Sequence, residues 1–305
     1  MEVTRLAGKA ILGLLVLALA TSACGGAIQA AQTGQVKVVA GQNFWGSIAT
    51  QLGGSRASVQ SVVTDPNADP HEYESNTNDA RAFADASLVI LNGAGYDTWG
   101  TKLLSANPGS HRTVLIAADL LGKKAGDNPH FWYNPDYVTR MADQITTDYK
   151  SIDPADAPYF DQQRALFAIA LKPYTQRLAE IKAKFSGVPV GATESIFVYM
   201  ATALGLNLIS PTEFMNAVAE GNDPPASAVI DFQNQITGKQ VKVLVYNVQT
   251  ATAVTTNIKH LAALADIPVV GVSETLQPES ATFQDWQLSQ LLALQNALNA
   301  SALTS

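Results

Sequence analysis

Short apolar runs alternate with helical patterns along most of this chain, and this alternation limits the possible folds more than any other feature. In the first half, apolar residues recur at helical spacing at Phe44, Ile48 and Leu52, and two glycines then end the pattern. Strands that alternate with helices indicate a parallel sheet covered by helices, so we expect an α/β fold. Four runs in this half have the length of buried strands: residues 36–40, 59–63, 88–91 and 113–117.

The second half repeats the alternation after a different stretch. Residues 155–185 contain no strand run and no glycine, and apolar residues recur there at helical spacing. One helix of that length would reach roughly 45 Å and could join two lobes, with a kink expected at Pro173. Beyond it, strands are expected at residues 188–191, 241–246 and 267–272 and helices at 196–204, 226–238, 253–265 and 282–303.

The N-terminus has the charge layout of an export signal. Arg5 and Lys9 precede an apolar run at residues 11–20, which is too short for an ordinary membrane-spanning helix. Cys24, the only cysteine, follows small residues in a pattern that resembles the lipobox of bacterial lipoproteins, although Thr21 stands where that pattern usually has leucine. We expect lipidation at Cys24. Ordinary signal cleavage that leaves a free thiol is the alternative.

These patterns divide the chain into five expected segments. The 47% hydrophobic and 15% charged composition suits a well-cored globular protein. A net charge of −7 without a basic patch disfavours a nucleic-acid partner. The segments are a signal peptide (1–23), a flexible tether (24–35), an N-terminal α/β lobe (36–150), a linking helix (151–186) and a C-terminal α/β lobe (187–305).

Four side chains of metal-binding type follow expected strands. In parallel α/β sheets ligands bind beyond the carboxyl ends of the strands, which is where these four residues stand. Both histidines come directly after a proline in a short polar segment, and imidazole is the commonest metal ligand. Two imidazoles and two carboxylates suit Mn²⁺, Fe²⁺ or Zn²⁺ better than Ca²⁺ or Mg²⁺. The expected ligands are His71, His130, Glu194 and Glu274.

Each candidate also has a plainer interpretation. Glu194 alone could be a carboxylate in the first turn of a helix, and Glu274 alone could be a surface charge. The other histidines, His111 and His260, lack the Pro-His context, and His260 fits a helix surface.

Neighbouring polar and aromatic residues are expected to have structural roles. Asp65 and Asp69 suit turns. The aromatic side chains that could wall the site are better explained as core: Phe44, Trp45 and Trp132. Three acidic residues are expected to be solvated or to lie behind the ligands rather than to bind the ion: Glu72, Glu74 and Asp79.

Several of these segments together resemble one family, the extracytoplasmic metal-binding receptors of zinc and manganese ABC importers, which includes streptococcal adhesin lipoproteins. The resemblance implies two α/β lobes joined by one long helix, with the metal in the cleft between them. It puts the four expected ligands in the family's metal-binding positions. The segments are DPHEYE at 69–74, LVILNGAGYDTW at 88–99, NPHFWYNP at 128–135, ATESIF at 192–197 with Tyr199, and SET at 273–275.

Two departures from the family pattern bear on the metal. Zinc-specific members tend to have a third histidine ligand and a histidine-rich acidic loop, whereas this chain has Glu194 and only His111 between the first two ligands. Manganese members usually end with aspartate, where this chain has Glu274. The residues therefore favour Mn²⁺ slightly over Zn²⁺, with Fe²⁺ as a third candidate.

The function expected from these features is that of a substrate-binding protein, not an enzyme. It would capture one divalent metal outside the membrane and deliver it to a permease, as a monomer tethered by a lipid to the outer face of the cytoplasmic membrane or free in the periplasm. ATP would be hydrolysed elsewhere, because no G-x-x-x-x-G-K-[ST] motif occurs.

Three other functions would use parts of the same pattern. The main alternative is an exported metal-dependent hydrolase that uses three of the ligands, a water and the remaining glutamate as base. A nucleotide-binding enzyme would need a third glycine after Gly93-Ala94-Gly95, which is missing. The last is a receptor for an organic solute, in which the histidines only donate and accept hydrogen bonds.

Overall fold

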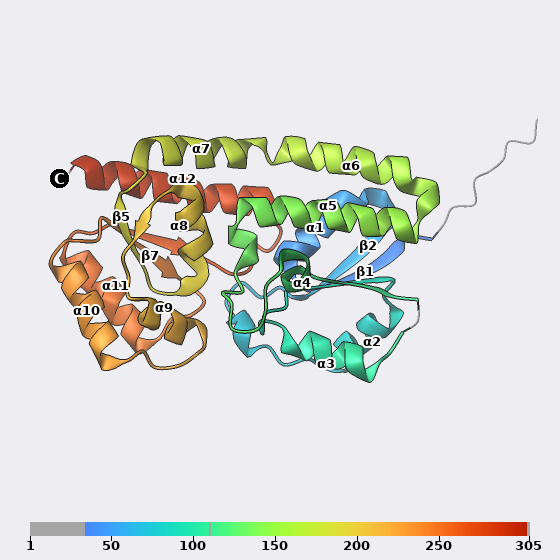
Figure 1. The fold of residues 1–305 in the computed structure, drawn as a ribbon, viewed down its shortest axis with the longest axis horizontal. Helices are drawn as coiled ribbons and strands as arrows, with labels where there is room; N and C mark the ends of the chain where they lie inside the picture. Colours follow the sequence, from blue (N-terminus) through green and yellow to red (C-terminus); the bar gives the residue numbers. More distant parts are fainter. Residues whose placement is uncertain (1–33, 110, 304–305) are drawn as a thin grey trace, which may run out of the picture. The chain divides into compact units, whose positions relative to one another are not determined.

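Two parallel sheets form the frame of the protein in a computed structural model that describes residues 34–109 and 111–303 (Figure 1). Each sheet has four strands, in the orders β2-β1-β3-β4 and β6-β5-β7-β8, and every strand pair is parallel. Helices cover both sheets. The predicted α/β class with two lobes is therefore confirmed.

The first sheet is built from strands close to the predicted ones: β1 (Val36–Gln42), β2 (Ala57–Val63), β3 (Leu88–Leu91) and β4 (Thr113–Ile116). Its helices are α1 (Asn43–Gly53), α2 (Thr77–Asp85), α3 (Thr98–Ala106), α4 (Ala117–Leu121) and α5 (Pro135–Ile152). Helices α3 and α4 were not predicted. They have nine and five residues, too few for a clear helical repeat in the sequence.

Helix starts follow the side-chain chemistry of their first residues. Asn76 accepts hydrogen bonds from the backbone N–H groups of Asn78 and Asp79 and caps α2. Asn134 caps α5 in the same way, and Pro135 occupies the first helical position, where its missing N–H costs nothing.

The second sheet consists of β5 (Pro189–Ala192), β6 (Asn207–Leu208), β7 (Val243–Asn247) and β8 (Val269–Val272). Its helices are α8 (Val198–Leu204), α9 (Thr212–Ala219), α10 (Ala226–Thr237), α11 (Ala253–Leu264) and α12 (Phe283–Leu303). Gly205 ends α8 with a φ of 68°, a left-handed conformation that favours glycine. The two-residue strand β6 and the helix α9 were not predicted.

The linking stretch is a long helix with a bend at Leu171. Its two parts are α6 (Ala157–Ala170) and α7 (Lys172–Phe185), and Pro173 lies in the first turn of the second part. The proline ring cannot fit against the carbonyl of the preceding turn, so the chain bends two residues before it. A bend was predicted, although at the proline itself.

A continuous apolar core connects the two sheets. One cluster of buried side chains includes residues from β1 and α1 as well as from β8 and α12. Helices α7 and α12 run side by side (Figure 1), and the Lys184 Nζ donates to the Asn299 Oδ1 at 2.6 Å. Helix α12 also reaches the first sheet's side, where the Phe283 N–H donates to the Ser47 Oγ at 3.0 Å.

Candidate metal centre

A short 3-10 turn, η2 (Pro70–Glu72), holds the first predicted ligand, His71. The Asp69 side chain accepts a hydrogen bond from the His71 backbone N–H at 2.9 Å, and Pro70 fixes the first position of the turn. The predicted turn role of Asp69 is thus confirmed. Asp65 has the same role four residues earlier, where its Oδ1 accepts from the Asn67 N–H at 2.8 Å.

Asn128 orients the second predicted ligand, His130. The Asn128 Oδ1 accepts from the His130 backbone N–H at 3.0 Å and lies 2.7 Å from the His130 Nδ1. The amide orientation follows from the other end of Asn128, whose Nδ2 donates to the Ser195 carbonyl at 2.7 Å. An oxygen next to Nδ1 requires the proton to be on Nδ1, so the Nε2 lone pair faces the site.

The two carboxylates come from the second sheet. Glu194 follows β5 and Glu274 follows β8, each two residues beyond the strand, and both side chains are fully buried. The Glu194 Oε1 accepts from the Ile196 backbone N–H at 3.1 Å, and the Glu274 Oε2 accepts from the Tyr96 hydroxyl at 2.6 Å. The carboxylates are therefore held by hydrogen bonds.

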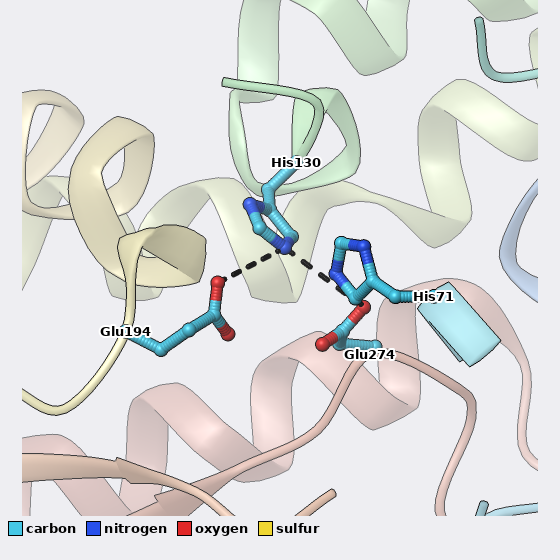
Figure 2. A group of neighbouring side chains, drawn as sticks. All are labelled: His71, His130, Glu194 and Glu274. Atoms are coloured by element: carbon cyan, nitrogen blue, oxygen red, sulfur yellow. Dashed lines mark ion pairs between the residues drawn. The ribbon is translucent and has the colours of Figure 1, made fainter. Parts of the chain in front are cut away.

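The four predicted side chains meet at one point, as Figure 2 shows. One nitrogen or oxygen atom from each lies within 4.8 Å of the corresponding atoms of the other three. The His71 Nε2 is 3.2 Å from the Glu274 Oε2, and the His130 Nε2 is 3.3 Å from the Glu194 Oε1 and 3.8 Å from the Glu274 Oε2. Four ligands at bonds of 2.0–2.2 Å in a tetrahedron are about 3.3–3.6 Å apart.

The two Nε2 atoms fit a cation for a second reason. Both are buried, and neither has a hydrogen-bond partner among the described residues apart from its carboxylate contacts. Buried polar atoms normally have such partners. A positive ion between these nitrogens and the two carboxylates would satisfy all four groups at once.

Burial and neighbouring charges shift the pKa values of all four side chains. Burial lowers the pKa of both imidazoles, but at His71 the Glu274 carboxylate outweighs it and raises the pKa to about 9. At His130 burial prevails and lowers the pKa to about 3. Burial and the nearby Glu274 charge raise the pKa of Glu194 to about 8. The charge of His71 outweighs burial at Glu274 and lowers its pKa to about 2.

A family model matches most of the chain. The model, described as the periplasmic zinc-uptake complex component A (ZnuA), matches residues 38–297. The chain belongs to this family.

Two curated relatives are named as manganese-binding or manganese-transport lipoproteins. The chain is similar to the manganese ABC transporter substrate-binding lipoprotein PsaA of Streptococcus anginosus, with 26% identity over 219 residues that cover 64% of this chain and 68% of PsaA. It is also similar to the manganese-binding lipoprotein MntA of Halalkalibacterium halodurans, with 24% identity over 242 residues that cover 73% of this chain and 76% of MntA.

Two solved structures share the fold. The substrate-binding protein FpvC of Pseudomonas aeruginosa, solved in complex with Mn²⁺, has a TM-score of 0.71 at 17% identity and covers 88% of this chain and 99% of its own. A crystal structure of ZnuA has a TM-score of 0.68 at 22% identity and covers 89% and 100%.

A large cavity opens beside the site of this ZnuA-family chain. Its volume is about 950 Å³, and His71 and Tyr96 form part of its wall. The His71 side chain is 19% exposed, whereas those of His130, Glu194 and Glu274 are fully buried. The side of His71 is therefore the side of the group that is open to solvent.

Aromatic rings pack against the imidazole of His130. Phe44 and Trp132 stack with centroids 3.9 Å apart, and Trp132 also packs against the His130 ring at 5.2 Å. Trp45 donates through its Nε1 to the Asn92 Oδ1 at 3.1 Å. All three aromatic residues lie in the core as predicted, and Trp132 walls the site as well.

The remaining candidates lie outside the group of four. Both other histidines, His111 and His260, are exposed, and so are Glu72 and Glu74. Asp79 also lies outside the group of four, but it is buried rather than solvated. It completes the capping box of α2 by accepting from the Asn76 N–H, and it also accepts from the Tyr73 hydroxyl, at 2.8 Å each.

The expected signal peptide (1–23) and the expected lipidation site, Cys24, lie outside the described residues. Across residues 34–109 and 111–303, no helix combines the length and the apolar character that crossing a bilayer needs.

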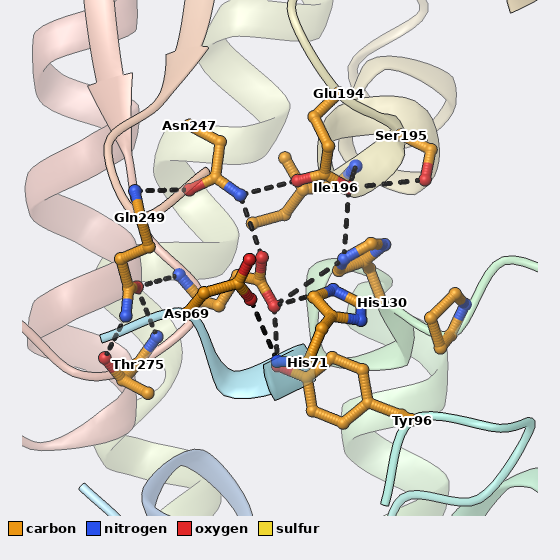
Figure 3. Close-up of polar contacts among 12 residues, drawn as sticks. Asp69, His71, Tyr96, His130, Glu194, Ser195, Ile196, Asn247, Gln249 and Thr275 are labelled. Carbon is orange, nitrogen blue, oxygen red and sulfur yellow. Dashed lines mark hydrogen bonds and ion pairs between the residues drawn. The ribbon is translucent and has the colours of Figure 1, made fainter. Parts of the chain in front are cut away.

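An amide that was not among the predicted site residues lies between the two carboxylates. Asn247 is the last residue of β7, and its Nδ2 donates to the Glu194 Oε2 at 2.5 Å and to the Glu274 Oε1 at 2.9 Å (Figure 3). The signal was present in the sequence, because Asn247 directly follows the strand expected at residues 241–246, which lies in the chain between the two that precede the glutamates. An amide is not a side chain of metal-binding type, so the pattern of candidate ligands did not include it.

Proposed function

We propose that this protein is the substrate-binding component of an ABC importer for a divalent transition metal. It binds one ion through His71, His130, Glu194 and Glu274 and delivers it to a membrane permease. The observation that carries the proposal is the meeting of two imidazole nitrogens and two carboxylate oxygens, from four separate loops, within 4.8 Å of one another. Membership of the ZnuA family supports the transport role.

The donor set favours Mn²⁺, Zn²⁺ or Fe²⁺ as the transported ion. Neutral imidazole suits these metals, whereas Ca²⁺ and Mg²⁺ prefer six or more oxygens. Two carboxylates also balance the charge of one divalent ion, which a buried site requires. The relatives named for manganese and the family named for zinc support the same group of metals.

Transport explains the site better than hydrolysis. A metal-dependent hydrolase would leave one coordination position to water and use the fourth residue as a base. Here the Asn247 amide holds both glutamates alike, and both are fully buried, so neither stands apart as a base. The solvent-exposed side of the centre is that of His71.

The proposal extends to location and organisation. Relatives named as lipoproteins support lipidation at Cys24 and a place on the outer face of the cytoplasmic membrane. The lipid would hold a monomer near its permease. The proposed segments remain a signal (1–23), a tether (24–35), two lobes (36–150 and 187–305) and the link between them (151–186).

Metal content is the direct test. The protein, a His71→Ala variant and a His260→Ala control are purified without chelator, dialysed against metal-free buffer and measured by elemental analysis. His260 is an exposed histidine outside the group of four, so its loss controls for removal of an imidazole as such. About one ion per chain is expected in the wild type and the control, and much less in His71→Ala. Equal metal in all three samples, or none in the wild type, would refute the proposal.

A further inference from the structure

Asn247 stands at the end of the strand that lies between the two glutamate-bearing loops. Strand β7 lies between β5 and β8, so its carboxyl end lies between the loops that carry Glu194 and Glu274. Neighbouring strands are about 4.8 Å apart. An amide at the end of the middle strand can therefore donate a hydrogen bond to a side chain on each of its two neighbours. The side chain of Asn247 fills this place and is 1% exposed.

The orientation of the amide is determined by its other contacts. The Asn247 Oδ1 accepts from the Gln249 backbone N–H at 3.0 Å, so Nδ2 must point toward the carboxylates. The Asn247 backbone N–H donates to the Thr193 Oγ1 at 3.2 Å and fixes the residue further. The NH₂ group has two hydrogens, and each is used by one glutamate.

As a result, each carboxylate has one oxygen held by the amide and one that faces the imidazoles. The oxygen that faces the imidazoles accepts a hydrogen bond, from the Ile196 N–H or from the Tyr96 hydroxyl, and keeps a second lone pair for an ion. The Glu194 Oε2 and the Glu274 Oε1 take the two amide hydrogens. The other two oxygens, the Glu194 Oε1 and the Glu274 Oε2, are those that face the imidazole nitrogens. For a second oxygen to reach the ion, its carboxylate would have to turn and leave the amide.

We infer that Asn247 is a specificity-determining residue that keeps both glutamates monodentate and so favours Zn²⁺ over Mn²⁺. The inference rests on the proposed function and narrows it. With one oxygen from each glutamate, the protein supplies four donors, the number that Zn²⁺ prefers in a tetrahedron. Mn²⁺ prefers six ligands, mostly oxygen, and the amide withholds two of the oxygens that could complete them.

Other sources of additional ligands are limited by burial. Water can approach from the cavity on the His71 side, while the other three ligand side chains are fully buried. The donor types alone favoured Mn²⁺ slightly, since a glutamate stands in the third ligand position. The number of oxygens that the glutamates can offer reverses that preference.

The first test compares metal affinities in variants. Asn247→Ala removes the amide. Asn247→Asp keeps its shape and its acceptor for the Gln249 N–H but offers no hydrogen to the glutamates. Competition with a chromophoric chelator gives the Zn²⁺/Mn²⁺ affinity ratio of each protein, and circular dichroism checks the fold. We expect the ratio to fall about 10- to 100-fold in both variants, the range typical for residues that orient metal ligands.

Asn128→Ala is the matched control. It also removes a buried amide that orients a ligand, but it acts on the His130 imidazole, which has a single donor atom for the ion. Its loss should lower the affinities for Zn²⁺ and Mn²⁺ by similar factors and leave the Zn²⁺/Mn²⁺ affinity ratio unchanged. A ratio that is unchanged in the Asn247 variants, or that falls as far in Asn128→Ala, would overturn the inference.

X-ray absorption spectroscopy of the wild type makes the inference testable even if neither variant folds. The Zn²⁺ form is expected to show four nitrogen or oxygen neighbours, with no signal from a carboxylate bound through both oxygens. Bidentate glutamate in the Zn²⁺ or the Mn²⁺ form would overturn the role of Asn247 and leave the importer proposal intact. A wild type that binds neither metal would instead refute the proposed function.

Discussion

The charges at the site predict that metal binding weakens steeply when the solution is acidified. Without metal at pH 7, His71 is protonated, Glu274 is ionised, His130 is neutral and Glu194 is protonated, because the pKa values are about 9, 2, 3 and 8. The site then has no net charge. With a divalent ion and both carboxylates ionised it again has none, as a buried site requires.

Going from one state to the other releases two protons, one from His71 and one from Glu194. At pH 7 about 1 in 100 of the His71 side chains is neutral, and about 1 in 10 of the Glu194 side chains is ionised. One unit of pH changes each fraction about tenfold. Lowering the pH from 7 to 6 should therefore weaken the apparent affinity about 100-fold, or about 2.7 kcal/mol.

Two measurements check this prediction. Chelator competition, corrected for the chelator's own protonation, gives the affinity at each pH. Calorimetry in two buffers of different ionisation enthalpy gives the number of protons released for each ion bound. A Glu194→Gln variant should release one proton instead of two. A change of tenfold or less between pH 7 and 6, with at most one proton released by the wild type, would refute the reasoning.

Three further predictions follow from the same geometry. Between pH 6.5 and 8 the folded metal-free protein holds protons on His71 and Glu194 that the unfolded chain has lost. Its free energy of unfolding in urea should therefore fall as the pH rises, by about 1.4 kcal/mol per pH unit for each proton. A free energy of unfolding that rises over this range would contradict the prediction. In Glu274→Gln the pKa of His71 should drop toward its usual value, which NMR titration of the metal-free protein can detect, and an unchanged pKa would show that another group holds the proton. Asn128→Ala should lower the affinity for Zn²⁺ and Mn²⁺ alike by about 10- to 100-fold in a competition titration, because the His130 ring loses the acceptor of its Nδ1 proton; affinities equal to the wild type's would exclude that role.

The strands and the ligand loops could be predicted because they depend on local patterns. The run at residues 88–91 is buried on both faces, so all four of its residues are apolar, and β3 has the predicted bounds. The site followed from a rule about topology, that parallel strands share one carboxyl edge. His71 and His130 follow strands of the first sheet, and Glu194 and Glu274 follow strands of the second, so residues beyond the carboxyl edges of two different sheets meet at one point.

Other features depend on tertiary contacts that a single sequence does not reveal. The two-residue strand β6 has no periodicity of its own and exists through its pairing of Pro189 with Asn207 and of Val190 with Leu208. Asn247 looks like the end of an ordinary strand until the two glutamates are placed on either side of it. The buried role of Asp79 likewise depends on a hydroxyl from Tyr73.

Locating the ion in a crystal tests the central claim most directly. Crystals grown with Zn²⁺ or Mn²⁺ can be measured on both sides of the metal's absorption edge, so that an anomalous difference map shows the ion alone. The account predicts one peak about 2.0–2.2 Å from the Nε2 atoms of His71 and His130, the Glu194 Oε1 and the Glu274 Oε2. A peak elsewhere, or an ion that lacks ligands from one of the two lobes, would contradict it.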